Sequence, residues 1–180
     1  MKLRILSWNV RGANDREKRK LIKEVIKSQK ADLVCLQETK NQEMSNGLVK
    51  SLGVGRCLEW GVLNSKGAVR GVLVFWDNRV LKLEEMEVGK FTVSCRFKNC
   101  EDGFGWCFSG VYGPTAKYER EELWSELGAI RGIWNEPWCV AGDFNMIRFP
   151  YERSRGGRLS QEMRRFSEVV EELDLKDLPL

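Results

Sequence analysis

The fold of this chain is most constrained by the order in which short apolar runs and amphipathic helical stretches follow one another. Residues 3–10 have the length and composition of a strand, and residues 33–36 form a continuous apolar run typical of a buried strand. Between these runs, apolar residues recur at helical spacing at Leu21, Ile22, Val25 and Ile26. The chain therefore opens as strand, helix, strand, which indicates a layered α/β fold.

The first helix carries a sequence signal for its start. Asn14 is followed three residues later by Glu17, which is the spacing of a capping box. We therefore predict that Asn14 is the N-cap of this helix and that its apolar stripe faces the core.

The middle of the chain is rich in β-forming residues. Between about residues 56 and 112, strand-like runs at 72–76, 91–95 and 106–112 alternate with turn signals, including the glycine-containing stretch 67–71. We predict an antiparallel meander or a set of hairpins here, with residues 67–71 as a hairpin turn.

The last third of the chain returns to alternating helix and strand. A helical stripe contains Leu123, Leu127, Ile130 and Trp134. It is followed by a strand at 138–141 and by a final helix that starts near Ser160. With no repeat, low-complexity tract or linker, residues 1–180 are expected to form one α/β domain.

The absence of histidine excludes several kinds of chemistry within these 180 residues. Neither a Ser-His-Asp triad, a Cys-His pair nor a histidine-bound zinc is available. The six cysteines include no C-x-x-C pair, and the N-terminus does not read as a signal peptide, which favours reduced thiols in the cytoplasm or nucleus. No apolar run approaches the ~20 residues of a membrane span, and a net charge of +4 permits a phosphate-bearing substrate.

Polar residues follow several of the strand-like runs at their C-terminal ends. These residues are Asn9, Glu38, Tyr112, Asp143 and Asn145. In layered α/β folds, ligand groups converge at the carboxyl ends of strands. Two carboxylates without a basic catalyst suit a hard divalent cation, Mg²⁺ or Mn²⁺, together with a phosphate. Asp143 would then orient or deprotonate a water, and Asn145 would donate to a phosphate oxygen.

Each of these residues also has an ordinary structural interpretation. Asn9 and Asn145 are common turn formers, Glu38 is typical of a solvated loop, and Asp143 follows a glycine as in many turns. Tyr112 fits the edge of a core equally well. The sequence pattern by itself leaves these alternatives open.

A basic segment comes directly after Asn145. It contains Arg148, Arg153, Arg155 and Arg158. Its charge and its position predict contact with a phosphate backbone, although a solvated loop has the same composition.

Four strings in order carry a resemblance to a known family. They occupy residues 7–12 (SWNVRG), 36–40 (LQETK), 110–114 (GVYGP) and 142–145 (GDFN). Together they resemble the endonuclease/exonuclease/phosphatase superfamily. The continuation over residues 147–180 is most similar to the N-terminal endonuclease domain of plant LINE-type non-LTR retrotransposons.

The resemblance implies a fold and a set of roles. The fold would be a four-layer α/β sandwich, with two packed mixed or antiparallel sheets flanked by helices. Glu38 would bind the divalent metal with Asn9 beside it, and Tyr112 would contact the scissile phosphate. Asp143 and Asn145 would position the nucleophile and stabilise the transition state. The expected activity is Mg²⁺-dependent nicking of nuclear DNA that primes a reverse transcriptase encoded downstream in a full-length parent.

Two departures from the family pattern limit this expectation. Arg11 stands where some relatives have an acidic residue. The family also places further strands and a Ser-Asp-His motif after the point where this sequence ends, so we predict a domain incomplete at its C-terminus. Purified residues 1–180 are therefore expected to be poorly soluble and not to nick plasmid DNA.

Two other functions stay open at this point. One is a catalytically dead retroelement remnant with at most DNA binding. The other is a phosphatase or phospholipase of the same superfamily that acts on inositol or lipid phosphates, against which the basic segment argues.

Overall fold

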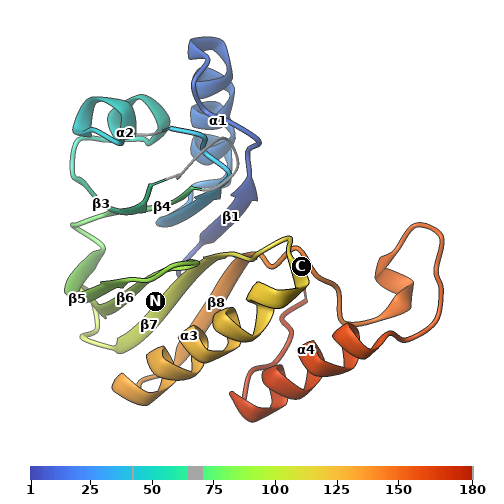
Figure 1. The fold of residues 1–180 in the computed structure, drawn as a ribbon. Coiled ribbons are helices and arrows are strands. Elements are labelled where there is room, and N and C mark those ends of the chain that lie inside the picture. The colour runs from blue at the N-terminus through green and yellow to red at the C-terminus, as the bar shows by residue number, and fades with distance from the viewer. Residues whose placement is uncertain (42, 65–70, 180) are drawn as a thin grey trace.

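The computed structural model describes residues 1–41, 43–64 and 71–179, and it contains two four-stranded sheets packed face to face (Figure 1). Sheet A has the strand order β1 (Ile5–Asn9), β2 (Leu33–Gln37), β4 (Val72–Asp77), β3 (Leu58–Leu63). Sheet B has the order β5 (Leu81–Val88), β6 (Thr92–Asn99), β7 (Gly105–Tyr112), β8 (Trp138–Asp143). Most of the predicted turn at 67–71 lies outside the described residues.

Helices cover the outer face of each sheet. Sheet A is covered by α1 (Arg16–Gln29) and α2 (Asn46–Leu52), and sheet B by α3 (Arg120–Ile133) and α4 (Gln161–Glu172) (Figure 1). Two 3₁₀ turns, η1 (Lys117–Glu119) and η2 (Pro150–Glu152), precede α3 and α4. The predicted four-layer α/β sandwich is confirmed.

Four apolar clusters of the described residues hold the layers together, and the smallest of them packs Ile130 and Trp134 against Cys107 of β7. The central cluster lies between the sheets and includes Cys35, Trp76, Phe97 and Phe108. The second joins α1 and α2 to sheet A, and the third joins α3 and α4 to sheet B, where Trp124 stacks on Phe166 with ring centroids 5.2 Å apart. Burial of these faces supplies the main free energy that keeps the layers in place.

The start of α1 differs from the prediction. Its N-cap is Asp15, which has extended backbone angles and accepts a hydrogen bond from the Lys18 amide at 3.0 Å. Asn14 instead donates its side-chain amide to the Lys40 carbonyl at 3.2 Å, a contact between distant parts of the chain. The predicted stripe is also too wide, because Leu21 is 66% exposed while Ile22 and Ile26 face sheet A.

The β-rich middle is antiparallel as predicted, but it divides between the two sheets. β3 and β4 complete sheet A, whereas β5, β6 and β7 form a meander in sheet B. No local signal marks this change of sheet, because it depends on which face each strand buries. The final helix is confirmed, and Ser160 caps it by accepting from the Met163 amide.

The order of the strands brings four carboxyl ends together. β1 pairs in parallel with β2, and β7 pairs in parallel with β8. The two pairs pack on each other where the sheets meet, with β1 against β8. Within the described ranges, no helix is both long enough and apolar enough to span a membrane.

Candidate active site at the strand ends

The predicted site residues lie at one end of the sandwich. Asn9 is the register partner of Gln37, and Tyr112 is the register partner of Asp143. Glu38 directly follows β2, and Asn145 follows β8 by two residues. Parallel pairing of β1 with β2 therefore places Asn9 and Glu38 at the same edge of sheet A. Parallel pairing of β7 with β8 places Tyr112 and Asp143 at the same edge of sheet B, as the sequence predicts.

A chain of hydrogen bonds joins the two sheets at this edge. The Asn9 side-chain amide donates to Asp143 Oδ2 at 2.8 Å, and the Asn145 backbone amide donates to Asp143 Oδ1 at 2.9 Å. Asn9 Oδ1 in turn accepts from the Arg11 amide at 3.0 Å. Both carboxylate oxygens of Asp143 are thus held as acceptors, so the group has a defined orientation.

The backbone after β7 supports the same arrangement. Asn145 Nδ2 donates to the Gly113 carbonyl at 2.6 Å, and the Gly113 amide donates to the Asp143 carbonyl at 2.7 Å. Tyr112 is only 6% exposed and belongs to the core between the sheets. Its structural interpretation holds, and its contact with a phosphate stays a prediction.

Glu38 is held in a different way. Its backbone has a φ of 57°, its amide donates to the Gly71 carbonyl at 2.8 Å, and its carbonyl accepts from the Gly12 amide at 2.7 Å. Its carboxylate lies 3.4 Å from Lys40 Nζ and is 17% exposed. Lys40 lies in the 36–40 string but had no predicted role. The sequence did contain a signal for this ion pair, because a lysine stands two residues after the glutamate.

Backbone strain concentrates at this edge. Of the six non-glycine residues with positive φ in the described ranges, four lie here: Arg11, Glu38, Lys40 and Asn145. Each left-handed residue costs roughly 1 kcal/mol and persists only where its surroundings hold it. Such strain is typical of functional sites.

The donor set suits a hard divalent cation. Glu38 offers carboxylate oxygens and Asn9 an amide oxygen, and the described residues contain no cluster of three His, Cys, Asp or Glu side chains. This set is too small for a closed structural metal site, but it suits a divalent cation that keeps waters and takes substrate oxygens. Cys35 is buried in the core between the sheets, and this burial raises the pKa of its thiol to about 12.

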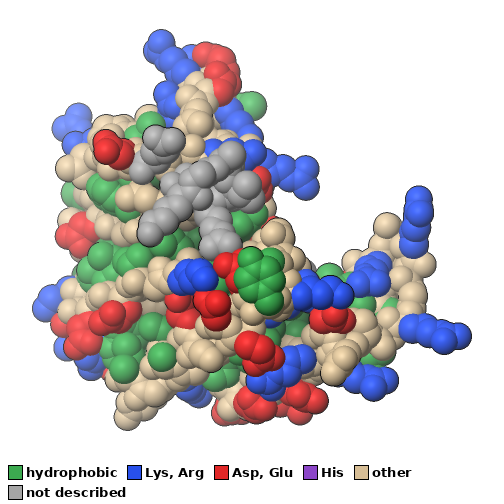
Figure 2. Space-filling model, in the orientation of Figure 1, with side chains coloured by type: hydrophobic (Ala, Val, Ile, Leu, Met, Phe, Trp, Pro, Cys, Tyr) green, Lys and Arg blue, Asp and Glu red, His purple; other side chains and the backbone are tan. Residues whose placement is uncertain are grey.

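The predicted basic segment protrudes beside this edge. Figure 2 shows Lys and Arg side chains along it and along α1, on opposite sides of a hollow in this face of the molecule. Arg153, Arg155 and Arg158 are exposed. Arg148 differs, because its guanidinium donates to Asp177 Oδ2 at 2.6 Å and its side chain is only 15% exposed.

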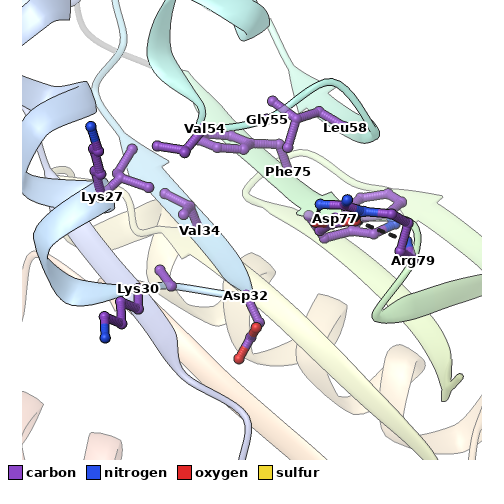
Figure 3. Close-up of a pocket in the computed structure, with 13 residues that line it drawn as sticks. Lys27, Lys30, Asp32, Val34, Val54, Gly55, Leu58, Phe75, Asp77 and Arg79 are labelled. Atoms are coloured by element: carbon purple, nitrogen blue, oxygen red, sulfur yellow. Dashed lines mark hydrogen bonds and ion pairs between the residues drawn. The ribbon is translucent and has the colours of Figure 1, made fainter. Parts of the chain in front are cut away.

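A cavity of about 290 Å³ lies elsewhere (Figure 3). It is lined by residues at the start of β2 and the end of β4, including Asp32, Phe75 and Arg79, and Lys27 and Lys30 lie at its edge. The strand ends that carry Asn9 and Glu38 are at the opposite end of sheet A. None of the predicted site residues lines this cavity.

Comparisons with known proteins agree with this geometry. Residues 6–170 match the model of the Endonuclease/Exonuclease/phosphatase family, whereas no curated protein matches. The AP endonuclease of Leishmania major superposes with a TM-score of 0.69 at 16% identity over 95% of this chain and 66% of that one. The endonuclease domain of TRAS1, a telomere-specific non-LTR retrotransposon, gives 0.69 at 13% identity over 95% and 72%.

A phosphatase shares the fold as well. The mannosyl-6-phosphatase of Bacteroides thetaiotaomicron has a TM-score of 0.60 at 17% identity, covering 80% of this chain and 66% of that one. The chain thus spans just under two thirds of the length of this phosphatase and of the Leishmania enzyme. At these identities the likeness establishes the fold alone.

Proposed function

The chain belongs to the endonuclease/exonuclease/phosphatase family, and from this premise we propose that it is a divalent-cation-dependent endonuclease that hydrolyses phosphodiester bonds of double-stranded DNA. The observation that carries the proposal is the hydrogen bond between Asn9 and Asp143, together with that between Asp143 and Asn145. These contacts join the two sheets at the strand ends that also carry Glu38.

Asp143 is proposed to act on the attacking water. Its two oxygens already accept from Asn9 and Asn145, which limits its rotation and leaves the remaining lone pairs to orient a water and take its proton. Asn145 Nδ2 uses one proton on the Gly113 carbonyl. The second proton is available for a non-bridging phosphate oxygen, where negative charge develops in the transition state.

Glu38 is proposed to hold the cation, with Asn9 beside it. Bound Mg²⁺ or Mn²⁺ would offset the negative charge of the phosphate and lower the pKa of a coordinated water. Lys40 keeps the Glu38 carboxylate partnered and oriented in its present position. Tyr112 is proposed to contact the scissile phosphate from the strand beside Asp143.

DNA is favoured as the substrate by the exposed arginines. Arg153, Arg155 and Arg158 lie exposed on the segment that follows Asn145, and they are proposed to contact the DNA backbone. Arg148 belongs to the same predicted set, but its guanidinium is committed to Asp177. The same proposal includes three further points: the nicked DNA is a target site for retrotransposition, the protein acts in the nucleus, and a full-length protein has a reverse-transcriptase region downstream. The structural likeness to the TRAS1 endonuclease domain supports this part of the proposal.

Turnover by these 180 residues is expected to be slow. They contain no histidine, so no imidazolium among them contacts the phosphate. Loss of one charged contact to the transition state costs several kcal/mol, or about 10³-fold in rate. The test must therefore detect a single turnover.

The test is plasmid nicking with the protein in molar excess. With the DNA in excess we expect no detectable nicking. With the protein in excess we expect slow, EDTA-sensitive conversion of supercoiled to open-circular DNA with Mg²⁺, which is lost in Glu38→Gln and Asp143→Asn. The control Glu24→Gln, on the exposed side of α1, should nick as the parent does. Nicking that survives both site substitutions would contradict the proposal.

Two other outcomes would identify the alternatives. If the parent shows no more nicking than Asp143→Asn, the chain is a catalytically dead remnant. Release of phosphate from inositol phosphates or mannose 6-phosphate without DNA nicking would favour a phosphatase, the activity named for the Bacteroides structure.

A further inference from the structure

The segment between β8 and α4 holds a small stack of flat side chains. The rings of Phe149 and Tyr151 are stacked, with centroids 5.3 Å apart and planes inclined by 9°. The Arg148 guanidinium lies over the same Phe149 ring, 5.0 Å from its centroid. We call Arg148, Phe149 and Tyr151 the aromatic platform.

The platform is anchored to the body of the protein. Arg148 donates to Asp177 Oδ2 at 2.6 Å and to Ser167 Oγ of α4 at 3.4 Å. Glu152 Oε2 accepts from the backbone amides of Arg148 and Phe149, each at 2.8 Å. The platform is therefore held in place before any ligand binds, which reduces the entropy that binding would cost.

The outer member of the platform is open to solvent. Tyr151 is 79% exposed although its ring stacks on Phe149. Arg153, Arg155 and Arg158 follow on the same segment, and no hydrogen bond or ion pair of their side chains is found within the described ranges. An open aromatic face beside three unengaged cations matches a nucleobase attached to phosphates.

The geometry restricts the kind of nucleic acid. In a duplex the faces of the bases are covered by their neighbours, so a flat side chain can stack only on a base that is unpaired or displaced. We propose that the aromatic platform binds an unpaired nucleobase of the DNA substrate, while Arg153, Arg155 and Arg158 contact the adjoining backbone. This inference rests on the proposed function, and it adds a preference for DNA with a single-stranded gap or tail.

The test measures binding without catalysis. In EDTA, the parent protein is titrated into a duplex with a single-stranded tail that carries 2-aminopurine, whose fluorescence falls on stacking, and into a blunt duplex of the same length. We expect Tyr151→Ala to weaken binding to the tailed DNA about 10-fold and to abolish the quenching. Tyr151→Phe should bind within about twofold of the parent, because the stacking face is retained.

The matched control is Tyr118→Ala. Tyr118 is 83% exposed on η1, and no ring contact of its side chain occurs in the described part of the chain. This variant should leave both affinities unchanged. An equal loss of affinity in Tyr151→Ala for tailed and blunt DNA, or no loss for either, would overturn the inference and leave the platform a packing feature of the segment.

Failure of this inference can be separated from failure of the proposed function. If Tyr151→Ala binds tailed DNA like the parent while Glu38-dependent nicking persists, only the platform is wrong. If quenching depends on Tyr151 but no DNA is ever nicked, the endonuclease proposal is wrong and the platform stands.

Discussion

The two sheets contribute unequal halves to the candidate active site. In the sheet B half, Asp143 and Asn145 are held by hydrogen bonds of 2.6–2.9 Å. In the sheet A half, the Glu38 carboxylate has an ion pair of 3.4 Å with the side chain of Lys40. The difference suits the proposed roles, because a group that orients water must be rigid, whereas a cation ligand must be able to exchange its partner.

The largest expected effect separates these roles. Asp143→Asn should lower the single-turnover nicking rate by about 10³-fold, because the general base is lost while Mn²⁺ affinity is nearly unchanged. Glu38→Gln should instead weaken Mn²⁺ binding, measured by calorimetry. Equal loss of Mn²⁺ affinity in the two variants would remove the distinction between the halves.

Gly142 allows β8 to approach β7 closely next to Asp143. Its φ is 144°, and a Cβ at this position would overlap the Val111 carbonyl oxygen of β7. We expect Gly142→Ala to lower the free energy of unfolding by about 2 kcal/mol or more in urea titrations.

The matched control for this substitution is Gly128→Ala in α3, where a Cβ meets nothing within 4 Å. Substitution of a helical glycine of this kind by alanine should raise the free energy of unfolding by roughly 0.5–1 kcal/mol. If both variants are more stable than the unsubstituted protein, the close approach of β7 and β8 does not restrict position 142 to glycine.

The link between the halves can be measured directly. A double-mutant cycle with Asn9→Ala and Asp143→Ala should give a coupling free energy of about 1.5 kcal/mol, because the bond involves a charged acceptor and is partly buried. Urea unfolding of the unsubstituted protein, the two single variants and the double variant gives the four free energies of unfolding that the cycle needs. Independent, additive effects of the two substitutions would show that the sheets are not joined here.

The smallest effect is expected within the sheet A half. A cycle with Glu38→Gln and Lys40→Met should give less than about 1 kcal/mol, since Lys40 is 39% exposed. Added salt should reduce this value further. A coupling as large as that of Asn9 and Asp143, insensitive to salt, would mean that the two halves are equally rigid.

Local patterns were sufficient for much of the fold. The apolar run at 33–36 is buried in β2, and the helix with Leu123, Leu127 and Ile130 buries those residues as predicted. Ser160 begins the last helix. Each of these features depends on neighbours within a few residues, which sequence periodicity reports.

Other features depend on partners that are distant in the sequence. Asn14 does not cap α1, because Lys40 offers it a carbonyl and Asp15 takes the cap. Arg148 has the same charge as Arg153, yet Asp177, 29 residues away, engages its guanidinium. Sequence patterns do not predict such pairings.

The sequence by itself determined which chemical groups the site contains: oxygen donors, amides and a tyrosine at strand ends, without histidine. Only the tertiary structure decided how these groups meet. Asn9 and Asp143 are 134 residues apart and lie in different sheets, and they touch because burial of the two apolar inner faces packs β1 against β8. The physical reason is that composition and periodicity are local, whereas the packing of one sheet on another is set by the whole core.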